Sequence, residues 1–139
     1  MPWPQTTISA ARYAADYGIT LALQNHRPVI SDHRDVLRMV REVNAPSLKV
    51  CLDAGIMPDR RPEALRQAAR DVGALQALSH FGGEFKRGAD GIVCPRTPVA
   101  GGKTRDDDCN SAFARAMREI GYHGYIGYEL CHLLPVVLS

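Results

Sequence analysis

Four short apolar runs, each ending at a polar or ionisable side chain, place the strongest constraint on the fold of this chain. The runs are ITLAL (19–23), LKVCL (48–52), LQAL (75–78) and YIGY (125–128), and the polar residues at their ends are Gln24, Asp53, His80 and Glu129. Short, nearly continuous apolar runs are typical of parallel strands that are covered on both faces. The sequence therefore predicts four parallel strands.

A helical pattern precedes each of these runs. The predicted helices cover about 7–17, 32–43, 62–72 and 110–120, and their signals are Gly18, Asp32, Pro46, Pro62, Gly73 and Gly121. Asp is a preferred N-cap, Pro is tolerated at the first helical position, and Gly accepts the left-handed conformation that ends a helix. The chain is thus predicted to repeat a helix-strand unit four times.

The spacing of the strand ends supports a repeated unit. Gln24, Asp53 and His80 follow one another at intervals of 29 and 27 residues, close to the roughly 30 residues of one βα unit. The 49-residue interval from His80 to Glu129 is longer because a stretch rich in Gly, Pro and charge, 85–108, intervenes. We expect that stretch to be a surface loop. Such units form either an open doubly wound sheet or part of a (βα)8 barrel, and periodicity alone does not choose between them.

The composition narrows the class of protein. With 139 residues, 45% of them hydrophobic and 23% charged, the chain is expected to form one globular domain over residues 1–139. Its 17 basic and 15 acidic residues form no long block of one sign, so no nucleic acid partner is expected. No run reaches the roughly 20 apolar residues of a membrane span. The four cysteines show no CxxC spacing and no apolar signal segment opens the chain, which predicts reduced thiols in the cytoplasm.

The polar strand ends are the candidate functional residues. Carboxyl ends of parallel strands meet at one rim of the sheet, where functional groups collect in both candidate folds. Gln24, Asp53, His80 and Glu129 would then offer oxygen and nitrogen ligands suited to Mn²⁺, Mg²⁺, Co²⁺ or Zn²⁺. The alternative is that these side chains only mark where each strand leaves the core. Dinucleotide, P-loop and serine-hydrolase motifs are absent from the sequence.

Four segments of the chain resemble a known family. LALQNH, VCLDAG, LSHFGGEF and YIGYELC are similar to the last four strand motifs of sugar-phosphate isomerases and epimerases in the xylose-isomerase-like TIM barrel superfamily. The family pattern there is Glu-Asn-His, Leu-Asp, a His-bearing strand and a terminal Glu. The resemblance covers essentially the whole chain. It implies parallel βα units that form half of a TIM barrel, strands five to eight of eight.

The resemblance also implies a divalent metal site. By position, Asp53, His80 and Glu129 match three metal ligands of the family, and Glu129 matches a catalytic base that moves a proton next to the sugar carbonyl. Gln24 stands where the family has its first glutamate. An amide oxygen can coordinate a metal, but it is neutral and accepts no proton at working pH. Glu129 would then be the single base.

Further residues are candidates for substrate contacts. The resemblance implies that Asn25 and His26 line the substrate pocket, while Glu84 and Arg87 follow His80 closely enough to reach a sugar hydroxyl or phosphate. The alternatives are a loop-capping Asn, a surface His and solvated loop charges.

Three functions follow from these observations. The leading hypothesis is a sugar or sugar-phosphate isomerase or epimerase with metal-assisted proton transfer next to a carbonyl. The second is a non-catalytic half-barrel that binds a partner or ligand, and the third is a metal-dependent endonuclease relative. A half-barrel has two open strand edges, so we expect a homo-oligomer or pairing with a separate N-terminal half.

Overall fold

Four parallel strands form one sheet, as the sequence predicts. A computed structural model describes residues 5–82, 85–87, 89, 91, 93–95 and 105–129. The elements in chain order are α1 (Gln5–Asp16), β1 (Leu21–Gln24), α2 (His33–Val43), β2 (Leu48–Asp53), α3 (Pro62–Val72), a 3-10 turn (Gly73–Leu75), β3 (Gln76–Gly82), β4 (Phe85–Arg87), β5 (Val93–Pro95), α4 (Arg105–Glu119) and β6 (Tyr125–Glu129). The parallel sheet has the order β1-β2-β3-β6. This α/β arrangement is that of a partial TIM barrel.

Local signals explain where the central helices begin and end. Asp32 caps α2: its side chain accepts from the backbone N–H of Arg34 at 2.9 Å, and Asp35 completes a capping box. Asn44 ends α2 in the left-handed conformation, with φ of 49°. Pro62 occupies the first turn of α3, where its missing N–H costs nothing.

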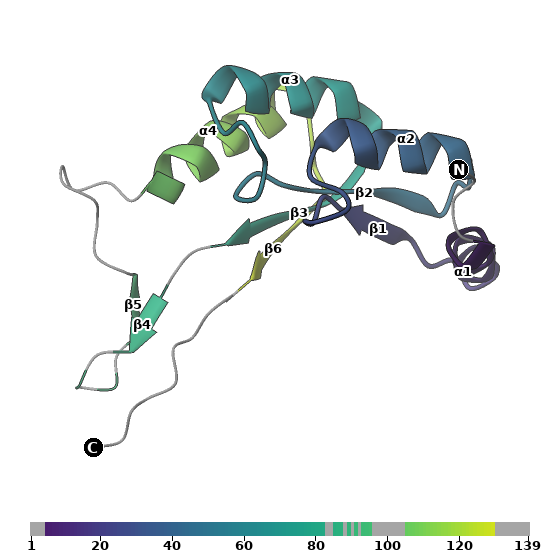
Figure 1. Ribbon diagram of the computed structural model, residues 1–139, viewed down its shortest axis with the longest axis horizontal. Helices are drawn as coiled ribbons and strands as arrows, with labels where there is room; N and C mark the ends of the chain where they lie inside the picture. The colour runs from purple at the N-terminus through teal and green to yellow at the C-terminus, as the bar shows by residue number, and fades with distance from the viewer. Residues whose placement is uncertain are drawn as a thin grey trace.

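The hydrophobic core lies between the sheet and three helices. Helices α2, α3 and α4 lie together on one side of the sheet, and α1 lies at the β1 end (Figure 1). The largest apolar side chains that are fully buried are Val36, Val50, Leu52, Leu65 and Phe113. Phe81 of β3 packs edge-on against Phe113 of α4, with ring centroids 5.9 Å apart. The helices therefore cover one face of the sheet.

The central and outer strands differ in burial. Strand β2 is buried at five of its six positions, whereas β1 is only half-buried and Tyr125, Ile126 and Tyr128 of β6 are exposed. Ile19, which the sequence places in the first strand, precedes β1 and is 54% exposed. The two strands at the edges of the described sheet are thus more exposed than the central strand β2.

The sequence predicts a surface loop over residues 85–108, but the described part of this stretch contains two short strands and the beginning of a helix. Strands β4 and β5 within it pair antiparallel, with Lys86 opposite Cys94, and α4 begins at Arg105, five residues before the predicted start at Asn110. Each of these strands has only three residues, too short for the alternating pattern that identifies a strand in sequence. Among the described residues, no helix is long and apolar enough to cross a membrane.

Candidate functional site

The predicted site residues lie at the carboxyl ends of neighbouring parallel strands. Asp53 of β2 is the register partner of His80 of β3, and Glu129 of β6 is the register partner of Gly82, two residues beyond His80. Gln24 ends β1, next to β2. The backbone therefore brings all four positions to one edge of the sheet, although the Glu129 side chain falls outside the described part of the structure.

Asp53 is the centre of the described polar contacts at this edge. The Gln24 amide Nε2 donates to Asp53 Oδ2 at 3.1 Å, and the Gly55 backbone N–H donates to Asp53 Oδ1 at 2.8 Å. Asp53 is 6% exposed, and this burial raises the pKa of its carboxyl above the ordinary value. The hydrogen bonds from Gly55 and Gln24 and the nearby His80 act in the opposite direction. A buried carboxylate of this kind favours a neighbouring cation.

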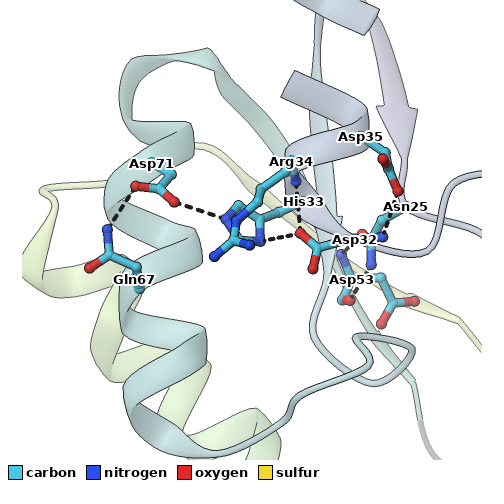
Figure 2. Close-up of polar contacts among 8 residues, drawn as sticks. All are labelled: Asn25, Asp32, His33, Arg34, Asp35, Asp53, Gln67 and Asp71. Atoms are coloured by element: carbon cyan, nitrogen blue, oxygen red, sulfur yellow. Dashed lines mark hydrogen bonds and ion pairs between the residues drawn. The ribbon is translucent and has the colours of Figure 1, made fainter. Parts of the chain in front are cut away.

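Asn25 joins β1 to β2 through its side chain. Its Nδ2 donates to the Asp53 carbonyl oxygen at 2.9 Å, and its Oδ1 accepts from the Asp53 backbone N–H at 2.7 Å (Figure 2). Asn25 is fully buried. These two bonds hold the backbone at Asp53, so the predicted substrate contact of Asn25 rests on the family resemblance alone.

The structure describes the other three predicted substrate residues to different extents. His26 is exposed, lines a cavity, and has its Nδ1 2.8 Å from the Arg27 carbonyl oxygen. Arg87 lies in β4, but its side chain is outside the described residues, and so is all of Glu84. Their roles stay predictions.

Two glycines shape the site, and neither is among the site residues predicted from the sequence. A Cβ atom at Gly55 would lie 3.2 Å from Asp53 Oδ1, and one at Gly127 would lie 3.1 Å from His80 Cδ2. These contacts are tighter than ordinary van der Waals separations. Glycine at 55 and 127 therefore lets the backbone approach the Asp53 and His80 side chains, which no local sequence signal reveals.

A cavity of about 820 Å³ lies beside these strand ends. It is lined by His26, Arg27, Gly55, Ile56, Met57, Pro58, Asp59, Arg60, Arg61, Pro62 and Cys109. Gly55 lines this cavity and also donates to Asp53. Cavities of this size are typical of small-molecule sites.

The side-chain groups at this edge of the sheet are chemically suited to bind a divalent ion. Asp53 and His80 supply a carboxylate and an imidazole on adjacent strands, and Gln24 adds an amide at the same edge. Among the described side chains, no three His, Cys, Asp or Glu residues cluster as a metal site. The observation that supports a cation is the burial of the Asp53 carboxylate, whose negative charge an ion would balance.

These features define an α/β protein whose parallel strands carry polar groups at their carboxyl ends. The xylose isomerase-like TIM barrel family model matches residues 8–134. The chain belongs to this family. No curated protein sequence matches the chain.

Solved structures with the same fold include enzymes of different activities. A D-allulose 3-epimerase from Methylomonas sp. is 22% identical with a TM-score of 0.63, over 88% of this chain and 38% of that one. The 3-keto-D-glucoside 4-epimerase from E. coli is 18% identical with a TM-score of 0.63, over 90% and 43%. A probable 3-DHS dehydratase from Bacillus anthracis is 15% identical with a TM-score of 0.60, over 90% and 48%. The chain thus spans less than half the length of these proteins, and at these identities the likeness concerns the fold.

Proposed function

We propose that this chain carries part of the active site of a metal-assisted isomerase or epimerase that acts on a small sugar or sugar phosphate. The observation that carries the proposal is the pairing of Asp53 with His80 at the carboxyl edge of the sheet, with Gln24 bonded to Asp53. Membership of the xylose isomerase-like family supports it, as do the sugar epimerases among the structural neighbours.

Each residue has a separate task in this proposal. Asp53 and His80 would hold a divalent ion, together with the Glu129 carboxylate and the Gln24 amide oxygen. When bound, such an ion supplies positive charge that polarises a carbonyl. Glu129 accepts the proton from the carbon next to the sugar carbonyl and delivers it to the former carbonyl carbon, which gives the isomer, while return of the proton to the original carbon gives only exchange. Gln24 is neutral, so it orients Asp53 through its amide and takes no part in the proton transfer.

The test is solvent deuterium exchange. The 139-residue chain is incubated in D₂O with Mn²⁺ and a panel of ketoses and ketose phosphates, and loss of the proton next to the carbonyl is followed by NMR. We expect exchange with wild type and at least a hundredfold less with Glu129→Gln, since a positioned base contributes on the order of 10²–10⁴ in rate. This readout detects proton transfer even where no net product accumulates.

Two variants separate metal binding from proton transfer. Asp53→Asn should abolish the Mn²⁺ binding seen by calorimetry, because it removes the described carboxylate of the site. Glu63→Gln changes an exposed carboxylate of α3 and should leave both readouts unchanged. Wild-type exchange rates equal to those of Glu129→Gln on every sugar would overturn the catalytic proposal.

One observation favours a second candidate, a non-catalytic domain that binds a ligand or partner. Both Asp53 carboxylate oxygens already accept hydrogen bonds within the chain, Oδ1 from Gly55 and Oδ2 from Gln24. In this alternative these bonds satisfy the carboxylate without a metal. Mn²⁺ affinity unchanged by Asp53→Asn, together with no deuterium exchange, is the result that this alternative predicts.

A further inference from the structure

A buried histidine at the start of α2 lies between two carboxylates from different parts of the chain. His33 Nε2 is 2.9 Å from Asp71 Oδ2 of α3, and His33 Nδ1 is 2.8 Å from Oδ1 of Asp32, the N-cap residue of α2 (Figure 2). The two carboxylates are partly exposed, whereas the ring is buried. Each ring nitrogen of His33 therefore lies close to a carboxylate oxygen and away from solvent.

The protons on the ring decide whether these two contacts attract or repel. A neutral imidazole carries one N–H, so its other nitrogen would direct a lone pair at a carboxylate oxygen. The Nε2 contact is a hydrogen bond, while the Nδ1 contact is a close ion pair without hydrogen-bond geometry. Only the imidazolium, with a proton on each nitrogen, is attracted to both carboxylates.

The charged groups around His33 come from the loop before α2, from α2 and from α3. Asp32 and Asp71 contact the ring, and Asp35 completes the capping box at the start of α2. Arg34 is the adjacent basic residue, and its charge also acts on Asp71. Burial and Arg34 oppose a positive charge on the ring, while the two carboxylates in contact with it favour that charge. Further charged residues of α2 line a hollow with Arg34 and Asp71, and they are Arg38, Arg41 and Glu42.

The loop between β1 and α2, residues 25–32, links this contact to the candidate site. Asn25 bonds the first end of the loop to the backbone of β2. At the other end, Asp32 caps α2 through Oδ1, the same atom that lies beside the His33 ring. His26 of this loop lines the cavity beside the strand ends. The contacts of His33 thus hold the far end of a loop that forms part of the cavity wall.

We propose that His33 is an imidazolium in the folded chain and that its contacts with Asp32 and Asp71 form a pH-sensitive latch for the β1–α2 loop. While the ring is charged, both contacts hold the end of the loop against α3. Once the ring loses its proton, the Nδ1 lone pair repels Asp32, the cap of α2 weakens, and the loop opens more often from this end. The latch is therefore closed at mildly acidic pH and loosens as the pH rises, which is the direction expected for a cation that folding stabilises.

The ring nitrogens of His33 test the charge assignment directly. The 139-residue chain, labelled with ¹⁵N in its histidine rings, is titrated by NMR from about pH 5 to about pH 10 without metal or sugar, so the result is independent of the proposed function. The variant His33→Gln identifies the His33 signals. We expect both ring nitrogens to carry protons at pH 7, where an ordinary histidine is mostly neutral. A neutral His33 ring at pH 7 would overturn the proposal.

Two carboxamide substitutions separate the contact from general charge effects. Asp32→Asn removes the carboxylate beside Nδ1 but keeps a good N-cap residue, so the chain should fold while its His33 ring is mostly neutral at pH 7. Glu63→Gln removes the same charge from the exposed start of α3 and should leave the ring protonated. Equal proton loss in both variants would mean a general charge effect and would overturn the latch.

Hydrogen exchange tests whether the ring charge controls the loop. The Ile30 amide donates to the His26 carbonyl oxygen within the loop. The Val36 amide donates to the Asp32 carbonyl oxygen in the first turn of α2. Their protection, corrected for the intrinsic effect of pH on exchange, should fall on the order of fivefold as His33 loses its proton, because two partly buried ion pairs are lost. In His33→Gln the same amides should show no such step. Constant protection in wild type, or an equal step in His33→Gln, would overturn the latch.

Discussion

The side chain at position 24 affects the net charge at the carboxyl ends of the strands, because a neutral glutamine stands there. Gln24 donates from Nε2 to Asp53 Oδ2, so the amide stabilises the Asp53 carboxylate without adding charge. A glutamate at this position would face Asp53 with a second carboxylate. Like charges at this distance raise the pKa of one partner and destabilise the folded state, unless a cation lies between them.

Gln24→Glu should therefore make stability depend on metal. We expect the free energy of unfolding without metal to fall by roughly 1–2 kcal/mol at neutral pH, since one pKa unit corresponds to about 1.4 kcal/mol. Mn²⁺ should restore the loss and bind more tightly than to wild type. Denaturant unfolding with EDTA and with Mn²⁺, together with calorimetry, measures both effects.

Gln67 supplies a matched control for this substitution. Its Nε2 donates to Asp71 Oδ1 at 2.7 Å, which is the same amide-carboxylate contact on the exposed surface of α3. Gln67→Glu adds the same charge beside a carboxylate but away from the strand ends. A stabilisation by Mn²⁺ as large in Gln67→Glu as in Gln24→Glu would show that the effect is not specific to the site.

The positions of the site residues can be predicted from sequence more readily than their contacts. Gln24, Asp53, His80 and Glu129 end apolar runs, and parallel strand ends meet at one edge regardless of detail. The contacts depend on register between strands, which sequence patterns do not determine. The two bonds from Asn25 to the Asp53 backbone are of this second kind.

Helices α2 and α3 are joined by a buried histidine. His33, at the first position of α2, is 4% exposed and has Nε2 2.9 Å from Asp71 Oδ2 of α3 and Nδ1 2.8 Å from Asp32 Oδ1 (Figure 2). The hydrogen bond from His33, with smaller effects from Gln67 and Arg34, lowers the pKa of Asp71. The Asp71 carboxylate is therefore stabilised in the folded chain relative to the unfolded chain.

Asp71→Ala should destabilise the chain in a pH-dependent way. The contribution of a lowered carboxyl pKa is complete above the unfolded pKa, near 3.9, and is lost as pH falls through the folded pKa. We expect a loss of about 1–2 kcal/mol near pH 7, because His33 loses a partner, and a smaller difference from wild type near pH 3. Urea unfolding at both pH values measures it, with Glu63→Gln as the surface control. A difference that grows toward pH 3 would contradict the assignment.

The sequence predicts elements well where local chemistry sets their ends. Asp32 and Pro62 mark the starts of α2 and α3 because their cap and ring chemistry act within one turn. Short strands carry no such signal, which is why the pairing of Phe85–Arg87 with Val93–Pro95 was not predicted. The Gly- and Pro-rich sequence around these two strands is typical of a loop.

The sheet of the whole molecule has two outer strands, β1 and β6. Their sequences, LALQ and YIGYE, contain neither lysine nor proline, the residues that usually hinder edge pairing. Tyr125 is 83% exposed and Ile126 is 56% exposed. A sheet with such edges can pair with a second copy of the chain, and this pairing would extend the sheet.

The isolated 139-residue chain is therefore expected not to be a monomer. Light scattering across a dilution series should give a mass above the 15.2 kDa of one chain at all but the lowest concentrations. Tyr125→Lys places a charge on an edge strand and should shift the series toward monomer, whereas Tyr13→Lys, on the exposed surface of α1, should not. A monomer of 15.2 kDa at every concentration, with one cooperative melt, would contradict this expectation.

The contact between Asn25 and Asp53 has a kinetic consequence. The Asp53 backbone N–H donates to the side-chain oxygen of the buried Asn25 and not to a backbone carbonyl. This hydrogen bond connects β1 and β2 beyond their last described register pair, Gln24 with Cys51. The Asp53 amide proton is thus shielded from solvent until this outer strand opens. Its rate of exchange with D₂O reports how often β1 detaches, and so how long the polar strand ends persist as one assembled edge.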